Sequence, residues 1–76
     1  MKYLRNEKVI KALGKRIRAV RKAKKMSMET LAYTAGIEYS QLSRIEMGQI
    51  NTSVSHVAVI AKILEVPITT LFEFDL

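Results

Sequence analysis

The residues Thr34–Glu46, TAGIEYSQLSRIE, place a single glycine between two short runs of helix-forming residues. A glycine that follows the last residue of a helix can adopt the left-handed backbone conformation, which ends the helix and turns the chain sharply. After Gly36, the apolar side chains of Leu42 and Ile45 stand three residues apart, as they do on one face of a helix. The stretch therefore predicts two short helices joined by a tight turn, with Ile37 filling the corner.

The second helix of this pair, at about residues 39–47, carries small polar side chains on the flanks that its apolar residues leave free. These flank residues are Tyr39, Ser40, Ser43, Arg44 and Met47, with Gln41 at the margin. Ala32 lies where the two helices come closest, and a larger side chain there would push them apart. A narrow, polar helix can enter the major groove of DNA and reach base edges. The pattern indicates a helix-turn-helix that binds double-stranded DNA, and a helical hairpin without a ligand is the alternative with the same spacing.

Helical patterns also surround this pair. Before it, apolar residues at spacings of three and four predict an amphipathic helix at about 7–25, and Ser27 is a good N-cap for the helix at about 28–35. After it, Ser53 caps a helix with the expected inward residues Val54, Val57, Ile60, Ala61 and Leu64. Pro67 then opens a fifth short helix through residue 72.

The length and the patterning together define the expected fold class. With 76 residues the chain has room for one small domain, and nothing before residue 72 alternates with a period of two. We therefore expect an all-α fold, a compact domain of residues 1–76 with five helices. The last residues, 71–76, alternate between apolar and acidic side chains, so a short C-terminal strand is also possible.

The composition excludes several classes of site. There is no cysteine and only one histidine, His56, so neither a disulfide framework nor a histidine or thiolate metal cluster is available, and no cofactor is expected. No nucleophile with a neighbouring base is evident, so the chain is not expected to be an enzyme. The first residues, MKYLRNEK, lack the apolar run expected of a secretory signal, and no uncharged stretch of about 18 residues occurs. We expect a cytoplasmic protein with no membrane partner and no small-molecule ligand.

The positive charge is concentrated at one end of the chain. Residues 1–25 hold eleven Lys and Arg residues against one acid, Glu7, whereas residues 26–76 hold two basic and six acidic residues. Such a block attracts polyanions, which include nucleic acid and acidic membrane surfaces, and a solvated helix face is the alternative interpretation.

Residues 27–51, SMETLAYTAGIEYSQLSRIEMGQIN, carry a family resemblance. They are preceded by LGKRIRAVRKAKK and followed by SVSHVAVIAKILEVPITTLF. With the motifs L-S-R-I-E-x-G and A-K-I-L-x-V-x-x-x-x-L-F in order, the chain resembles the Xre or phage-repressor family, lambda repressor-like helix-turn-helix regulators of transcription. The resemblance covers about residues 13–72, with the helix-turn-helix at about 28–47, and it implies a five-helix DNA-binding domain that acts as a dimer on a pseudo-palindromic operator.

The same resemblance assigns roles to individual residues. The residues that match base-facing positions are Tyr39, Ser40, Ser43 and Arg44, and the Arg44 fork suits the O6 and N7 atoms of guanine. Contacts to the DNA backbone are expected at Ser27, Met28, Gln41, Gln49, Asn51 and Thr52, from the start of the second helix, the margin of the third helix and the loop after it. Arg21 and Glu46 are expected to be half-buried and to form a structural ion pair that fixes the angle of the third helix.

Three positions depart from the family pattern. Met28 stands where Gln is usual, Glu38 replaces a Ser or Thr cap, and Gln49 replaces a frequent Lys or Arg. These changes reduce the positive charge at the expected interface. They leave an alternative function open, in which the same fold is a protein-interaction module, such as an antitoxin-like or adaptor subunit.

The C-terminal residues Phe72, Phe74 and Leu76 are candidates for a homodimer interface. A two-fold dimer presents two recognition helices to two half-sites, and a small domain has little other surface for that association. The alternative is that these residues fold back on the first helix.

Overall fold

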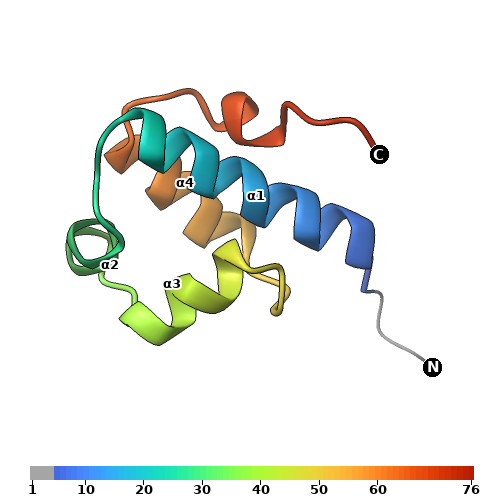
Figure 1. Ribbon diagram of the computed structural model, residues 1–76, viewed down its shortest axis with the longest axis horizontal. Coiled ribbons are helices and arrows are strands. Elements are labelled where there is room, and N and C mark those ends of the chain that lie inside the picture. Colours follow the sequence, from blue (N-terminus) through green and yellow to red (C-terminus); the bar gives the residue numbers. More distant parts are fainter. Residues whose placement is uncertain (1–4) are drawn as a thin grey trace.

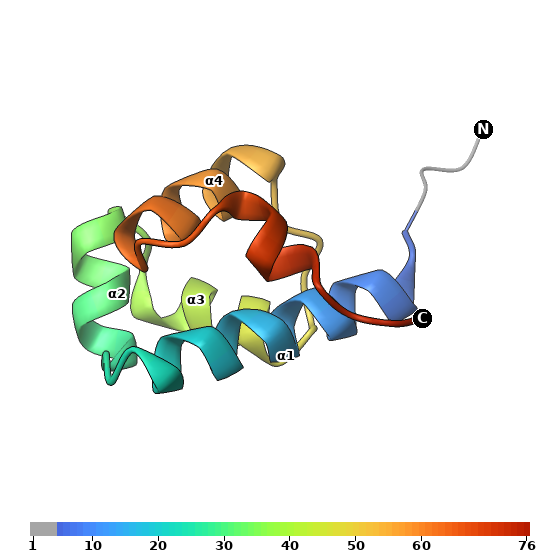
Figure 2. The same ribbon diagram turned by 90° about the horizontal axis from the view of Figure 1, so that it is seen from above.

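The computed structural model describes residues 5–76 of the chain. They form the α-helices α1 (Glu7–Ala23), α2 (Met28–Ala35), α3 (Tyr39–Glu46) and α4 (Val54–Ile63), followed by a 3-10 helix, η1 (Ile68–Phe72). In Figure 1, α3 lies on one side of α1 and the C-terminal segment lies on the other. Figure 2 shows α1 and α4 along opposite edges of the molecule. The C-terminal segment is therefore remote from the side on which α3 lies.

The helix boundaries follow from the capping residues. The hydroxyl of Ser27 accepts a hydrogen bond from the Thr30 amide at 3.0 Å, and the hydroxyl of Ser53 accepts one from the His56 amide at 3.1 Å. Each bond satisfies an amide that the first turn of a helix leaves without a partner. Gly36 ends α2 with φ at 69° and ψ at 29°, in the left-handed conformation. The sequence-based predictions of both caps and of the glycine turn are confirmed.

The end of α1 differs from the prediction. The helix stops at Ala23 and not near residue 25, because Lys25 adopts a φ of 58° and turns the chain. The Met26 amide donates to the carbonyl of Arg21 at 3.1 Å, which closes the turn.

The C-terminal elements also correct the prediction. The fifth helix is a 3-10 helix, in which the Thr70 amide donates to the Pro67 carbonyl three residues earlier. No strand is present within residues 5–76. The Phe74 amide instead donates to the Phe72 carbonyl at 3.0 Å, a local turn that leaves the amide unavailable for a strand ladder.

The core is one apolar cluster to which every helix contributes. Its members are Leu13, Ile17, Val20, Leu31, Ala32, Ile37, Leu42, Ile45, Val57, Ile60, Ala61, Leu64 and Leu71. The expected inward residues of α4 lie here with one exception. Val54 is 72% exposed, because it begins the helix before the first side chain that reaches the core.

Gly14 sets how closely α1 and α3 approach. A Cβ atom at this position would lie 2.8 Å from the carbonyl oxygen of Glu46 and closer still to that of Ile45. Both obstacles are backbone atoms near the end of α3, so neither can rotate away. The absence of a side chain at residue 14 therefore lets α3 pack directly on α1.

We expect Gly14→Ala to destabilise the protein by about 1–3 kcal/mol, because the added methyl group overpacks the contact. Alanine is a better helix former than glycine by about 1 kcal/mol, so helix propensity alone predicts that Gly14→Ala stabilises the protein. Urea denaturation measures the free energy of unfolding, and the exposed helical residue Ala19, changed to Gly, gives the propensity term in the same helix. A Gly14→Ala protein as stable as the parent would contradict the close approach.

Candidate nucleic-acid interface

The outer face of α3 is exposed and polar. Leu42 and Ile45 point into the core, whereas Ser40 and Arg44 are exposed and Tyr39 is 54% exposed. Within residues 5–76 the Arg44 side chain forms no hydrogen bond and no ion pair, so its guanidinium donors are free to bind a ligand. The structure thus brings the four predicted base-contact residues together on one helix.

Two further polar groups of α3 have internal contacts. Ser43 is half-buried, and its hydroxyl lies 3.7 Å from the sulfur of Met47. This contact to sulfur is weak, so the hydroxyl can exchange it for a better acceptor. Gln41 is half-buried at the margin of the face.

The start of α2 offers backbone groups and not side chains. The Ser27 hydroxyl is engaged with Thr30, accepting from its amide and donating to its hydroxyl at 3.0 Å. Met28 is half-buried and packs against the core. An anion at this helix start would therefore meet the free first-turn amides.

The loop between α3 and α4 holds the other predicted backbone contacts. Gln49 and Asn51 are exposed, and the half-buried Thr52 has its hydroxyl 3.5 Å from Nδ1 of His56. Arg5 donates from Nη2 to the Gln49 carbonyl at 2.8 Å and also pairs with Glu7. Arg5 thus brings a guanidinium to the loop in which Gln49 replaces a basic residue.

The Arg21 side chain joins three segments at the back of this face. Its Nε donates to Oε2 of Glu46 at 2.7 Å, its Nη2 donates to Oε1 at 3.0 Å, and its Nη1 donates to the Met26 carbonyl at 2.9 Å. Arg21 is only 7% exposed and Glu46 only 4%. The expected pair is present, but both residues are buried and not half-buried as predicted. Its bidentate geometry ties the end of α3 to α1 and to the turn before α2.

Replacing Arg21 by Met leaves the Glu46 carboxylate buried without a partner, so we expect a loss of about 3–5 kcal/mol in the free energy of unfolding. The double variant Arg21→Met with Glu46→Leu removes both charges and should lose less. Urea denaturation of the two single variants and the double variant gives the coupling between the residues. Additive losses would show that the pair does not act as a unit.

The structure places the three candidate dimer residues in different environments. Phe74 packs against the core of its own protomer, with its ring centroid 6.2 Å from that of Phe72. Phe72 and Leu76 are exposed. Val54 and Val59 of α4 are exposed as well. Sequence reasoning missed this second apolar surface, although α4 is apolar on most sides, a pattern that signals burial.

Among residues 5–76, no three His, Cys, Asp or Glu side chains gather closely enough to hold a metal ion. None of the helices in this part of the chain is both long and apolar enough to cross a bilayer.

A glycine turn joins α2 to α3, the polar face of α3 points outward, and the buried Arg21–Glu46 pair ties the end of α3 to α1. These features define the class of helix-turn-helix, DNA-binding transcriptional regulators. The chain belongs to the helix-turn-helix family HTH_3, which matches residues 17–71. The predicted resemblance is confirmed.

Solved structures with the same fold are regulators. The restriction-modification controller protein C.AhdI from Aeromonas hydrophila is 35% identical, with a TM-score of 0.80 over 83% of this chain and 96% of that chain. SinR, a master regulator for biofilm formation solved in complex with DNA, is 37% identical, with a TM-score of 0.74 over 80% of this chain and 98% of that chain. The controller protein C.Esp1396I is 29% identical, with a TM-score of 0.78 over 86% of each chain. A comparison with curated proteins gave no match.

Proposed function

We propose that the protein is a sequence-specific regulator of transcription that places α3 in the major groove of pseudo-palindromic half-sites. The observation that carries this proposal is the outward face of α3, where the unpaired Arg44 lies among exposed polar side chains. The similarity to SinR, which was solved with DNA, supports it. Such a regulator acts where the DNA is, so a cytoplasmic location is part of the proposal.

In this proposal the contacts divide into two kinds. Base edges are met by Tyr39, Ser40, Ser43 and Arg44, and the fork of Arg44 binds guanine. The backbone is bound by Gln41, by the amides at Ser27 and Met28, and by the loop residues Gln49, Asn51 and Thr52. Arg5 adds a cation to that loop through its bond to the Gln49 carbonyl. The backbone contacts set the register that the base contacts need.

For Arg44→Ala we expect a loss of about 1–3 kcal/mol of discrimination at one base pair of the operator, because one bidentate contact disappears. The operator is first selected from a random pool, and binding is then measured on all of its single-base variants. Asn51→Ala is the matched control and should weaken every sequence equally. If Arg44→Ala weakens binding to every single-base variant of the operator equally, the Arg44 side chain contacts a phosphate and not a base.

The proposal includes a homodimer whose two recognition helices lie about 34 Å apart on successive half-sites. Its interface would be formed by exposed apolar side chains on adjacent elements, Val54 and Val59 of α4 with Phe72 and Leu76 of the C-terminal segment. Phe74 is also assigned to this interface from sequence. In the proposal it contributes indirectly, because its ring packs beside that of Phe72 and supports it. Exposed apolar side chains are costly to leave in water, and a two-fold contact would bury them.

Val59→Asp should convert the dimer to a monomer, because it places a charge in a desolvated apolar contact. Sedimentation equilibrium at micromolar concentration measures the change, and Thr34→Asp, at an exposed position on α2, should leave the dimer intact. A parent protein that sediments as a monomer under these conditions would contradict the interface.

A protein-interaction module is the second candidate function. The observation in its favour is a hollow between α2 and α3 lined by Glu29, Tyr33, Ile37 and Tyr39, in which Tyr33 is 89% exposed. Salt dependence separates the two functions, because DNA binding weakens with a log–log slope of about −0.9 per phosphate neutralised.

A further inference from the structure

Five basic residues of α1 form one continuous surface, which we call the basic stripe. Its members are Lys8, Lys11, Lys15, Arg18 and Lys22. Their spacing alternates between three and four residues, which aligns them on a single flank of the helix. All five are exposed. At 1.5 Å of rise per residue the stripe is about 21 Å long.

Within residues 5–76 no ion pair neutralises the stripe, although Asp75 lines a hollow together with Lys8, Lys11 and Lys15. The ion pairs found among residues 5–76 use Arg5, Arg16 and Arg21, none of which belongs to the stripe. Arg16 lies on another side of α1, where it donates to the Thr70 carbonyl at 2.8 Å and pairs with Glu73. Like charges one helical turn apart repel each other, so the stripe lowers the stability of α1 unless an external anion neutralises it.

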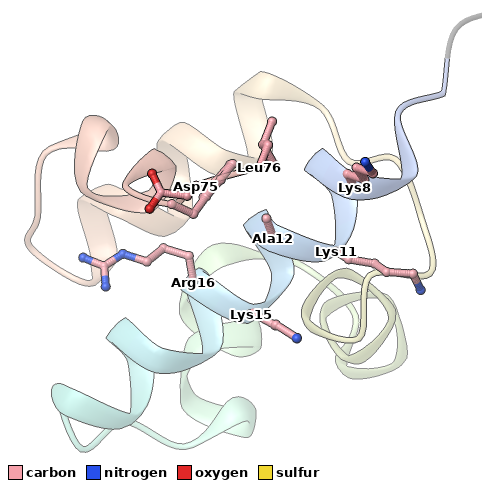
Figure 3. Close-up of a pocket in the computed structure, with 8 residues that line it drawn as sticks. Lys8, Lys11, Ala12, Lys15, Arg16, Asp75 and Leu76 are labelled. Carbon is pink, nitrogen blue, oxygen red and sulfur yellow. The ribbon is translucent and has the colours of Figure 1, made fainter.

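The middle of the stripe lies beside the expected DNA interface. A Cβ atom at Gly48 would be 2.8 Å from the Cα atom of Lys11, so this part of α1 touches the residue just before Gln49. Gly14, between Lys11 and Lys15, lies against the end of α3. Figure 3 shows Lys11 and Lys15 directed away from Asp75 and Arg16, which occupy the side of the C-terminal segment.

We infer that the basic stripe binds phosphates of the DNA backbone outside the base pairs read by α3. The inference rests on the proposed function. The loop after α3 begins the backbone contact, and the stripe continues it along α1. Each DNA strand carries one phosphate per 3.4 Å of helix axis, so phosphates are dense enough to serve stripe residues that rise about 4.5–6 Å from one to the next.

Lysine suits this role because it binds phosphate as a point charge without fixed geometry. The stripe therefore adds affinity equally for all sequences and releases bound counterions. It also supplies positive charge for DNA binding in a chain whose α3–α4 loop has Gln49 at a position where the family pattern frequently has Lys or Arg. In this arrangement α3 supplies discrimination, and α1 supplies attraction.

The test uses three variants of increasing size. The single variant is Lys11→Gln, the double variant adds Lys15→Gln, and the triple variant adds Lys8→Gln as well. Salt titration on a random duplex should give a log–log slope that becomes shallower by about 0.9 with each substitution. Lys62→Gln on α4 removes one exposed positive charge on another helix and should leave the slope unchanged. Glutamine has nearly the helix propensity of lysine, and circular dichroism checks that each variant is folded.

A second experiment tests whether the stripe contacts DNA outside the operator. On the selected operator, extending the duplex by one helical turn at each end should steepen the slope for the parent and not for the triple variant.

The outcomes are distinguishable. A parent protein that binds neither the random duplex nor any DNA selected from the pool overturns the proposed function itself. A steep parent slope that is unchanged in the triple variant overturns only the role of the stripe. The parent and the triple variant are also titrated with polyglutamate, which stands for an acidic protein surface. If the triple variant loses affinity for polyglutamate while the salt dependence of its DNA binding is unchanged, the stripe binds an acidic protein partner instead.

Discussion

The buried ion pair between Arg21 and Glu46 is the interaction on which the rest of the structure depends. A buried charge is tolerated only when it is paired and its hydrogen-bonding groups are satisfied. Here the guanidinium meets both carboxylate oxygens and a backbone carbonyl, so the geometry of three segments is specified together. The close approach at Gly14 acts at the same end of α3. Together they fix where the polar face of α3 points.

The parts of the fold that were predictable from sequence are those encoded locally. Ser27 and Ser53 signal helix starts, and Gly36 signals a helix end, because each acts on backbone groups within a few residues. The apolar spacing of α3 identifies its buried side and, by subtraction, its polar face. The Arg21–Glu46 pair joins residues far apart in the chain, and only the family resemblance made it foreseeable.

The features that were missed depend on contacts between distant segments. Arg5 reaches Gln49 across 44 residues, and neither residue carries a local signal of the contact. From sequence, Gly14 is only an unfavourable residue within an amphipathic helix, and the backbone of α3 that it contacts comes from a distant segment. The tail alternates like a strand, yet it lacks a neighbouring strand and turns on itself at Phe74.

The two ends of α3 are held differently. Its last turn is anchored by Gly14 and by the ion pair, and the following turn at Gly48 presses on α1. Its first turn has Glu38 as a cap residue that forms no capping hydrogen bond, so amides there remain open to solvent. The carboxyl end of α3 is therefore held by direct packing and by an ion pair, whereas the amides of its first turn have no side-chain acceptor and can donate to an external one.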